Sequence, residues 1–165
     1  MKTFEIKTTF TVYESEAELS EEDQKLLKMA RNAASRAYAV YSQFHVGAAL
    51  LLDNGEILTG NNQENCAYPS GLCAERTTAF YASSRFPGVP FKKLVITAVN
   101  PQSTLTTPVP PCGACRQVLS EYEQRGGHPI TVLMAGQEGE IWQVNSVQDL
   151  LPLTFSDSYL PDMTI

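Results

Sequence analysis

The sequence predicts an α/β sandwich with parallel strand pairing in its second half. Segments with the periodicity of strands alternate along the chain with segments that have the periodicity of helices, which is the pattern of a sheet covered by helices. The chain has 165 residues, and a chain of this length buries roughly 70% of its unfolded surface, enough for one core. Hydrophobic residues make up 43% and charged residues 18%, an ordinary globular composition.

The first half of the chain is expected to form a strand, a helix and a hairpin. Apolar and polar side chains alternate over residues 3–13, which predicts a strand. Residues 20–38 carry apolar side chains at helical spacing, and Ser20 is placed to cap this helix. Residues 45–61 are expected to form a hairpin, because Asn54-Gly55 separates two apolar segments and favours a tight turn.

The second half is expected to contain two long helices, three strands and a short final helix. The helices are expected at 73–85 and 113–124, the strands at 93–99, 129–134 and 140–144, and the final helix at 146–151. Both long helices begin where cysteines lie, next to the ends of strands. Open α/β sheets tend to place their active sites at such points.

Charge and hydropathy exclude two classes of partner. The chain has 12 basic and 18 acidic residues and a net charge of -6, which disfavours binding to the phosphate backbone of nucleic acids. The longest apolar run covers residues 46–52, whereas a membrane-spanning helix needs about 20 residues. The first residues carry no apolar signal segment. We therefore expect a soluble, cytoplasmic protein with neither nucleic acid nor membrane as its partner.

Three of the four cysteines lie at the starts of the two long helices, at positions 73, 112 and 115. The pair Cys112 and Cys115 alone is compatible with a redox dithiol or with part of a zinc site. A redox dithiol leaves Cys73 and Glu75 unexplained. Zinc held by three protein ligands keeps a fourth position for water, which is the catalytic pattern. We expect a catalytic zinc site; a dithiol redox protein and a non-catalytic zinc-binding module are the alternatives.

The other candidate ligands have unsuitable spacing. Cys66 lies seven residues before Cys73, an unusual distance for a pair of ligands, and it is expected to be a buried free thiol. His45 and His128 show no ligand spacing to any cysteine, so we expect them to be structural or solvated.

Three thiolates bring more negative charge than one Zn²⁺ neutralises. Two helix N-termini aimed at the sulfurs would offset part of this charge. Arg76, one turn after Cys73, is a second candidate, because its guanidinium can donate to a thiolate. Glu75 is the only acid next to a ligand in either motif, so we expect it to shuttle protons, a role worth about 10²–10⁴ in rate.

These motifs resemble those of the homotetrameric cytidine deaminases, which belong to the zinc deaminases. The resemblance runs from about residue 25 to 155, and the segments that carry it are Tyr41-Ser42-Gln43-Phe44, Val46-Gly47-Ala48-Ala49-Leu50, Asn62-Gln63-Glu64-Asn65-Cys66-Ala67-Tyr68-Pro69, Cys73-Ala74-Glu75-Arg76, Pro111-Cys112-Gly113-Ala114-Cys115-Arg116-Gln117 and Leu150-Leu151-Pro152. It implies a three-layer α/β/α sandwich with a mixed five-stranded sheet and an extra N-terminal strand. It also implies one domain over residues 1–165, with residues 1–19 as an N-terminal extension.

The resemblance implies an activity as well. Members of the family hydrolyse cytidine and 2′-deoxycytidine to uridine and 2′-deoxyuridine in pyrimidine salvage and release ammonia. Zinc would be bound by Cys73, Cys112 and Cys115, and Glu75 would activate the water and move its protons. A cysteine at the first ligand position is typical of members that act on free nucleosides rather than on polynucleotides. Another aminopyrimidine nucleoside-like compound is the alternative substrate.

The resemblance further implies a set of substrate contacts: Phe44, Asn62, Glu64, Ala67, Tyr68, Ala74 and Phe155. Phe44 would stack on the pyrimidine and the Ala74 backbone would hold the base edge. Asn62 and Glu64 would bind the ribose 3′-hydroxyl. Residues 60–72 contain no Lys or Arg, which favours a nucleoside over a nucleotide.

Three of these residues would act across subunit boundaries in the implied tetramer. Ala67 and Tyr68 would lie near the 5′ end of a substrate bound across a boundary, and Phe155 would pack on a neighbour's substrate. The chain departs from the family in its N-terminal strand (about residues 1–15), in a longer loop (100–110) and in Ser156-Asp157, where members commonly have Gly-Pro.

Overall fold

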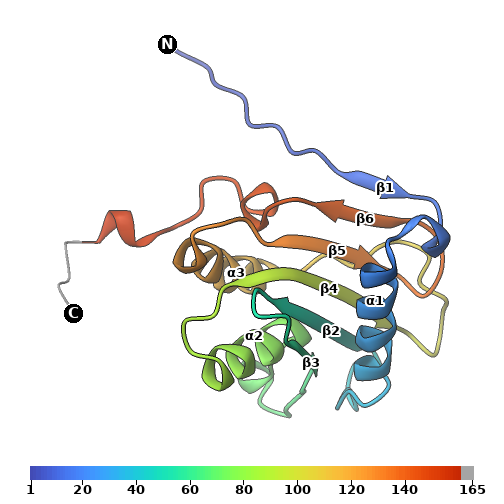
Figure 1. Ribbon diagram of the computed structural model, residues 1–165. Coiled ribbons are helices and arrows are strands. Elements are labelled where there is room, and N and C mark those ends of the chain that lie inside the picture. The colour runs from blue at the N-terminus through green and yellow to red at the C-terminus, as the bar shows by residue number, and fades with distance from the viewer. Residues whose placement is uncertain (161–165) are drawn as a thin grey trace.

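The structure, a computed structural model, describes residues 1–160 and contains a six-stranded sheet between layers of helices (Figure 1). The elements are β1 (Thr11–Tyr13), α1 (Glu21–Ala34), β2 (His45–Leu52), β3 (Ile57–Asn61), α2 (Ala74–Arg85), β4 (Phe91–Val99), α3 (Gly113–Gly126), β5 (Thr131–Ala135) and β6 (Ile141–Val144). Short 3₁₀ turns cover Glu16–Glu18, Tyr68–Ser70, Val147–Leu150 and Asp157–Tyr159. The predicted α/β/α fold with a mixed sheet and an added N-terminal strand is confirmed.

The strand order is β1-β6-β5-β4-β2-β3. Strands β4 and β5 pair in parallel, and the other neighbours pair antiparallel. The expected parallel pairing in the second half therefore holds for β4 and β5 but not for β5 and β6. These last two strands are joined by a short connection, which allows antiparallel pairing, whereas a parallel pair needs a crossover such as α3.

Side chains of the strands alternate between two apolar layers. In β2, Ala49 and Leu51 pack with residues of α1, whereas Ala48, Leu50 and Leu52 pack on the face covered by α2 and α3. Figure 1 shows α1 on one face of the sheet and α2 and α3 on the other. The two helices expected to carry the cysteines therefore share one layer.

Helix α2 lies unusually close to β3. A Cβ atom added at Gly60 would stand 2.5 Å from the Thr78 hydroxyl oxygen and 3.0 Å from the Thr78 backbone nitrogen. Only glycine allows this approach, which fixes the height of α2 above the sheet. None of the helices in the described part of the chain is long and apolar enough to cross a membrane.

The helix ends match most of the sequence predictions. The Ser20 hydroxyl accepts a hydrogen bond from the Asp23 backbone N–H at 3.1 Å and so caps α1 as expected. Helix α1 ends at Ala34, four residues earlier than predicted. Helix α3 ends at Gly126 and is capped by Gly127, whose left-handed φ of 73° suits glycine. The predicted final helix is a 3₁₀ turn, Val147–Leu150, capped by Ser146.

The predicted N-terminal strand is much shorter than expected. Alternation over residues 3–13 predicted one strand, but β1 covers Thr11–Tyr13 and pairs with the four-residue β6. Residues 1–10 have no regular secondary structure and leave the edge of the sheet (Figure 1). The prediction was wrong in length, because alternation shows that a strand can form but not whether a partner strand is present.

Candidate active site

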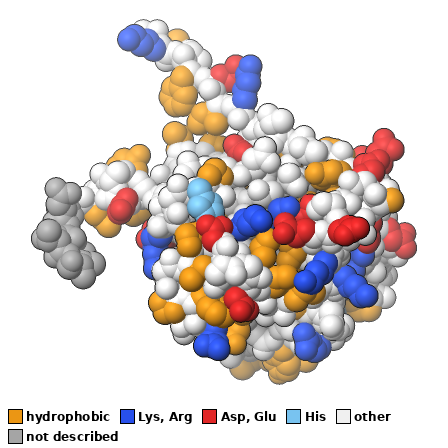
Figure 2. Space-filling view, in the orientation of Figure 1, with side chains coloured by type: hydrophobic (Ala, Val, Ile, Leu, Met, Phe, Trp, Pro, Cys, Tyr) orange, Lys and Arg blue, Asp and Glu red, His pale blue; other side chains and the backbone are white. Residues whose placement is uncertain are grey.

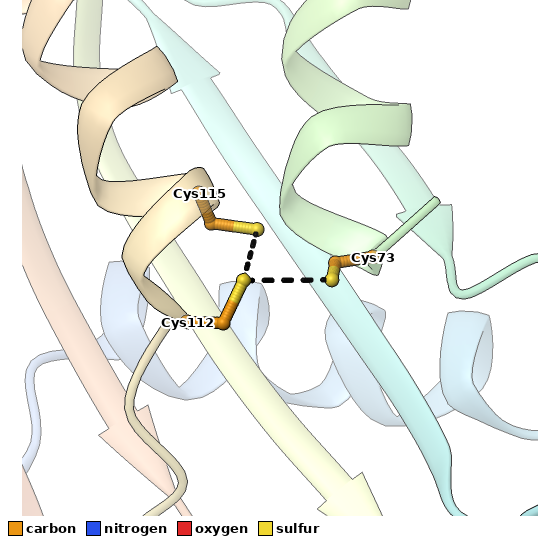
Figure 3. Close-up of side chains that lie close together, drawn as sticks. All are labelled: Cys73, Cys112 and Cys115. Carbon is orange, nitrogen blue, oxygen red and sulfur yellow. Dashed lines mark hydrogen bonds between the residues drawn. The ribbon is translucent and has the colours of Figure 1, made fainter. Parts of the chain in front are cut away.

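The three cysteines predicted to bind zinc lie together in space. Helices α2 and α3 begin side by side, and Cys73 and Cys112 occupy the position just before each helix. The Sγ atoms of Cys73, Cys112 and Cys115 all lie within 4.8 Å of one another, with separations of 3.7 Å for Cys73–Cys112 and 3.4 Å for Cys112–Cys115 (Figure 3). Soft thiolates converging in this way are a ligand set that suits Zn²⁺.

The surroundings of the sulfurs are electropositive. Neither Cys73 nor Cys112 caps its own helix with its side chain, so the sulfurs face each other beside two positive helix ends. The Arg76 guanidinium donates to the Cys73 sulfur at 3.7 Å, as predicted. The Nε atom of Arg76 is buried and has no hydrogen-bond partner within residues 1–160. An unpaired N–H of a positively charged guanidinium fits a site that holds excess negative charge.

The thiols interact strongly with one another. Hydrogen bonds from Cys115 and Arg76 to the Cys73 thiolate outweigh its burial and lower the pKa of Cys73 to about 5. The pKa of Cys115 is raised, because its thiol is engaged with Cys73, it is buried, and Glu75 lies close by. A bound divalent cation would stabilise all three cysteines as thiolates. The donor set fits zinc.

Glu75 lies in the first turn of α2, next to the sulfurs. Its side chain is almost fully buried, with 4% exposure. Burial, reinforced by the negative charge of Cys73, raises the pKa of Glu75 to about 6. A carboxyl group with a pKa near neutrality can both accept and donate a proton during one reaction.

A pocket of about 660 Å³ opens next to this cluster, within the range of small-molecule sites. Cys73, Glu75 and Cys112 line the part of it beside the cluster, which we call the inner end, and its walls include residues from the loops before β2 and after β3. The predicted substrate residues that line it are Phe44, Asn62, Glu64 and Tyr68. The pocket therefore brings together most of the residues that sequence analysis selected.

Asn62 and Glu64 hold the loop that carries Phe44. The Asn62 amide accepts from the Val46 N–H and donates to the Phe44 carbonyl, both at 2.8 Å. The Glu64 carboxylate accepts from the Tyr41 N–H at 2.8 Å and from the backbone N–H and hydroxyl of Ser42. These bonds, the Ser42 hydroxyl first, lower the pKa of Glu64. Both side chains keep unused lone pairs or hydrogens that a ligand can use.

The other predicted contacts lie outside the pocket lining. Ala74 is buried, and its carbonyl accepts from the Thr78 hydroxyl at 2.7 Å. Ala67 precedes the turn that starts at Tyr68. Phe155 is 58% exposed and stacks on Tyr159, with ring centroids 5.7 Å apart. Its implied role concerns a neighbouring subunit, so it stays a prediction.

Cys66 is exposed, so the prediction that it is buried was wrong. It lies between β3 and α2, two residues before the 3₁₀ turn Tyr68–Ser70. The histidines lie apart from the cysteine cluster. His128 forms a hydrogen bond with Asp53 at 2.8 Å, and His45 begins β2.

Sequence analysis gave no role to Arg116, which proves to be a structural link. Its Nε donates to the Pro111 carbonyl at 2.7 Å and one terminal nitrogen donates to the Leu150 carbonyl at 2.8 Å. It therefore ties the turn that leads into Cys112 to the C-terminal segment. Because both acceptors are backbone carbonyls, no residue pattern in the sequence could have indicated the link.

Comparison with known proteins gives a consistent result. Residues 20–126 match the family model described as the cytidine and deoxycytidylate deaminase zinc-binding region. The cytidine deaminase of Halalkalibacterium halodurans is 37% identical over 139 residues, which cover 84% of this chain and 98% of the relative. The cytidine deaminase of Sporosarcina psychrophila is 43% identical over 134 residues, covering 81% and 90%.

Solved structures agree with these relatives. The crystal structure of cytidine deaminase from Burkholderia pseudomallei superposes with a TM-score of 0.70 at 34% identity, covering 83% of this chain and all of that one. The cytidine deaminase of Mycobacterium tuberculosis superposes with a TM-score of 0.61 at 35% identity, covering 80% and 95%.

Proposed function

Because the chain belongs to the family of cytidine and deoxycytidylate deaminases, we propose that it hydrolyses cytidine and 2′-deoxycytidine to uridine and 2′-deoxyuridine with release of ammonia. The observation that carries this proposal is the convergence of three sulfurs beside a buried glutamate at the inner end of a pocket of about 660 Å³.

Zinc would be held by Cys73, Cys112 and Cys115, with Arg76 and the two helix N-termini offsetting the surplus negative charge. When bound, Zn²⁺ supplies a Lewis acid that lowers the pKa of a water molecule, so that water becomes a nucleophile near neutral pH.

Glu75 would move the protons. Its carboxylate takes a proton from the attacking water and gives it to N3 of the pyrimidine, while the water oxygen forms a bond to C4. It then carries the proton of the new hydroxyl to the amino group. The C4–N bond breaks, ammonia leaves, and the C4 carbonyl of uridine remains. Burial keeps the pKa of Glu75 at about 6, which suits a group that must both accept and donate.

The walls of the pocket would orient the nucleoside. Phe44 lines the pocket and offers an aromatic face to the base, and the Ala74 backbone lies beside the ligand Cys73. Asn62 and Glu64 offer an amide and a carboxylate to the ribose 3′-hydroxyl. Residues 60–72 contain no basic side chain that would favour a 5′-phosphate.

Contacts from other subunits would complete the site. Ala67 and Tyr68 would meet the 5′ end of the substrate across a subunit boundary, and Phe155 would reach a neighbour's substrate. The large exposed fractions of Tyr68 (75%) and Phe155 (58%) support a role at an interface. We therefore propose a homotetramer with one deaminase domain per chain and residues 1–19 as an extension.

The enzyme would act in pyrimidine salvage in the cytoplasm. All four cysteines are free in the structure, which suits a reducing compartment where thiols remain available to a metal.

The test is the loss of ultraviolet absorbance of cytidine with the purified protein, with zinc measured on the same sample. Cytidine, 2′-deoxycytidine and other aminopyrimidine nucleosides are compared side by side by kcat/KM. We expect the first two to be the best substrates. A protein with one zinc per chain and no turnover of either would refute the proposal. A metal-free protein with a reversible Cys112–Cys115 disulfide would instead support a redox role.

A further inference from the structure

Residues 2–10 form an extension that we call the N-terminal arm. It projects from the edge of the sheet (Figures 1 and 2), and Ile6 lies beside the C-terminal segment 151–156. Two contacts hold its base: the Thr8 hydroxyl donates to the Asp149 carbonyl at 2.7 Å, and the Phe10 ring packs edge-on against Trp142 at 5.9 Å. Residues 2–9 make no backbone hydrogen bond within the described part of the chain. The arm therefore presents unpaired strand edges.

The arm is amphipathic in the manner of a strand. Phe4 is 76% exposed and Ile6 is 50% exposed, although both are large and apolar. Glu5 and Lys7 extend on one common side, where their charged groups lie 3.7 Å apart. Thus one side of the arm is apolar and the other carries one acidic and one basic group, two residues apart.

The order of Glu5 and Lys7 allows two copies of the arm to pair acid with base when they run antiparallel. If two arms run antiparallel with Ile6 facing Ile6, each Glu5 faces a Lys7 of the other arm. In the same register the two Ile6 side chains meet, Phe4 faces Thr8 and Thr3 faces Thr9. If the register shifts so that Glu5 faces Glu5, two carboxylates lie opposite each other. If it shifts so that Lys7 faces Lys7, two ammonium groups lie opposite each other. Cross-strand pairs of opposite charge stabilise, whereas like charges destabilise.

We propose that the N-terminal arm pairs antiparallel with the arm of a second copy of this chain, in the register centred on Ile6. The partner is a second copy because Glu5 and Lys7, placed symmetrically about the exposed Ile6, match their own reversed order. A two-stranded ribbon alone is only marginally stable in water. The arm pair therefore strengthens contact between copies and comes apart on dilution. This inference concerns assembly and does not depend on the proposed reaction.

Disulfide trapping tests the register. In a chain with the exposed Cys66 replaced by Ser, Ile6→Cys places two thiols opposite each other, whereas Phe4→Cys places them out of register by roughly 13 Å. Under mild oxidation we expect Ile6→Cys to form disulfide-linked dimers at least about tenfold faster than Phe4→Cys. Because Phe4 is the more exposed residue, random collision would give the control an equal or higher rate. That result would overturn the proposal.

Charge reversal in the Ile6→Cys chain tests the complementarity. Glu5→Lys alone and Lys7→Glu alone each set like charges opposite each other and are expected to slow cross-linking by about tenfold. The double variant Glu5→Lys/Lys7→Glu restores both opposite pairs and is expected to restore the rate. Failure of the double variant to recover would contradict the register. Circular dichroism of each variant serves as the control for folding.

Discussion

The two ends of the pocket are built in different ways. At the inner end, the sulfurs and Glu75 stand on the first turns of α2 and α3, which pack against the sheet. At the outer end, Phe44 stands on an irregular segment and Tyr68 on the short 3₁₀ turn Tyr68–Ser70, and Tyr68 is largely exposed. The inner end is therefore positioned by core packing, whereas the outer end depends on hydrogen bonds made by individual side chains.

This difference suits the inner end to chemistry and the outer end to the selection of the substrate. Groups that carry out chemistry need fixed geometry, which helices packed on a sheet provide. Groups that select a substrate are commonly placed on loops held by a rigid scaffold. We expect substitutions at the inner end to act on kcat or on metal binding, and substitutions at the outer end to act mainly on KM.

The largest effect is expected from Glu75→Gln. The amide keeps the shape of the side chain but cannot accept and return a proton, so kcat should fall by about 10²–10⁴ while zinc stays bound. Steady-state kinetics and metal analysis on the same sample measure both. The matched control is Glu121→Gln, an exposed glutamate of α3. A Glu75→Gln enzyme with nearly full kcat would remove the proton shuttle from the mechanism.

The next effect is expected from Arg116→Ala. Removing the guanidinium leaves the Pro111 and Leu150 carbonyls without their donor, which should lower the free energy of unfolding by about 2 kcal/mol. Urea denaturation of the zinc-loaded protein measures this change. The exposed Arg36 provides the control, because Arg36→Ala should change stability by no more than about 0.5 kcal/mol. Equal stability of the two variants would show that the inner end does not need this link.

A smaller effect is expected from Glu64→Gln at the outer end. The amide oxygen can keep the N–H groups of Tyr41 and Ser42, but the amide nitrogen replaces the oxygen that accepts from the Ser42 hydroxyl, and the negative charge is lost. The loop that carries Phe44 should therefore be held less firmly. KM for cytidine should rise about tenfold, equivalent to about 1.4 kcal/mol, with little change in kcat. A fall in kcat at unchanged KM would break the proposed division between the two ends.

The smallest effect is expected from His128, which lies far from either end. A hydrogen bond to the Pro129 carbonyl, together with the Asp53 carboxylate, raises the pKa of His128 above 6.5. The folded chain therefore holds this proton more tightly than the unfolded chain. The contribution of protonated His128 to the free energy of unfolding is fully present below about pH 6.5 and is lost as the pH rises through the pKa of His128 in the folded chain. Because both side chains are over one-third exposed, the contribution is about 0.5 kcal/mol or less.

Comparing the wild type with His128→Gln tests this linkage. The difference in unfolding free energy should be larger near about pH 5.5 than near about pH 8.5. A difference that grows toward alkaline pH would contradict the assignment.

Sequence patterns predicted the inner end better than the outer end. The spacing of Cys112 and Cys115 places both sulfurs on one helical turn, and Glu75 follows Cys73 within the first turn of α2, so local geometry fixed most of their arrangement. Arg76 could be predicted for the same reason. Each of these pairs of residues is separated by no more than three positions, so helix periodicity determines how the two side chains lie.

The features that sequence reasoning missed depend on distant partners. Cys66 is exposed, and the burial of a cysteine cannot be judged from its type alone. The predicted strand over residues 3–13 lacked a partner beyond the short β6. Arg116 bonds to a carbonyl 34 residues away. None of these relations leaves a local pattern in the sequence.

The central claim is that a cation held by three sulfurs makes the pocket reactive. The most direct measurement removes zinc stepwise with a chelator and records both the zinc-to-chain ratio and the cytidine turnover of each sample. The account predicts one zinc per chain at full activity and a turnover that falls in proportion to the zinc removed. A zinc-free chain that deaminates cytidine at the full rate would contradict it.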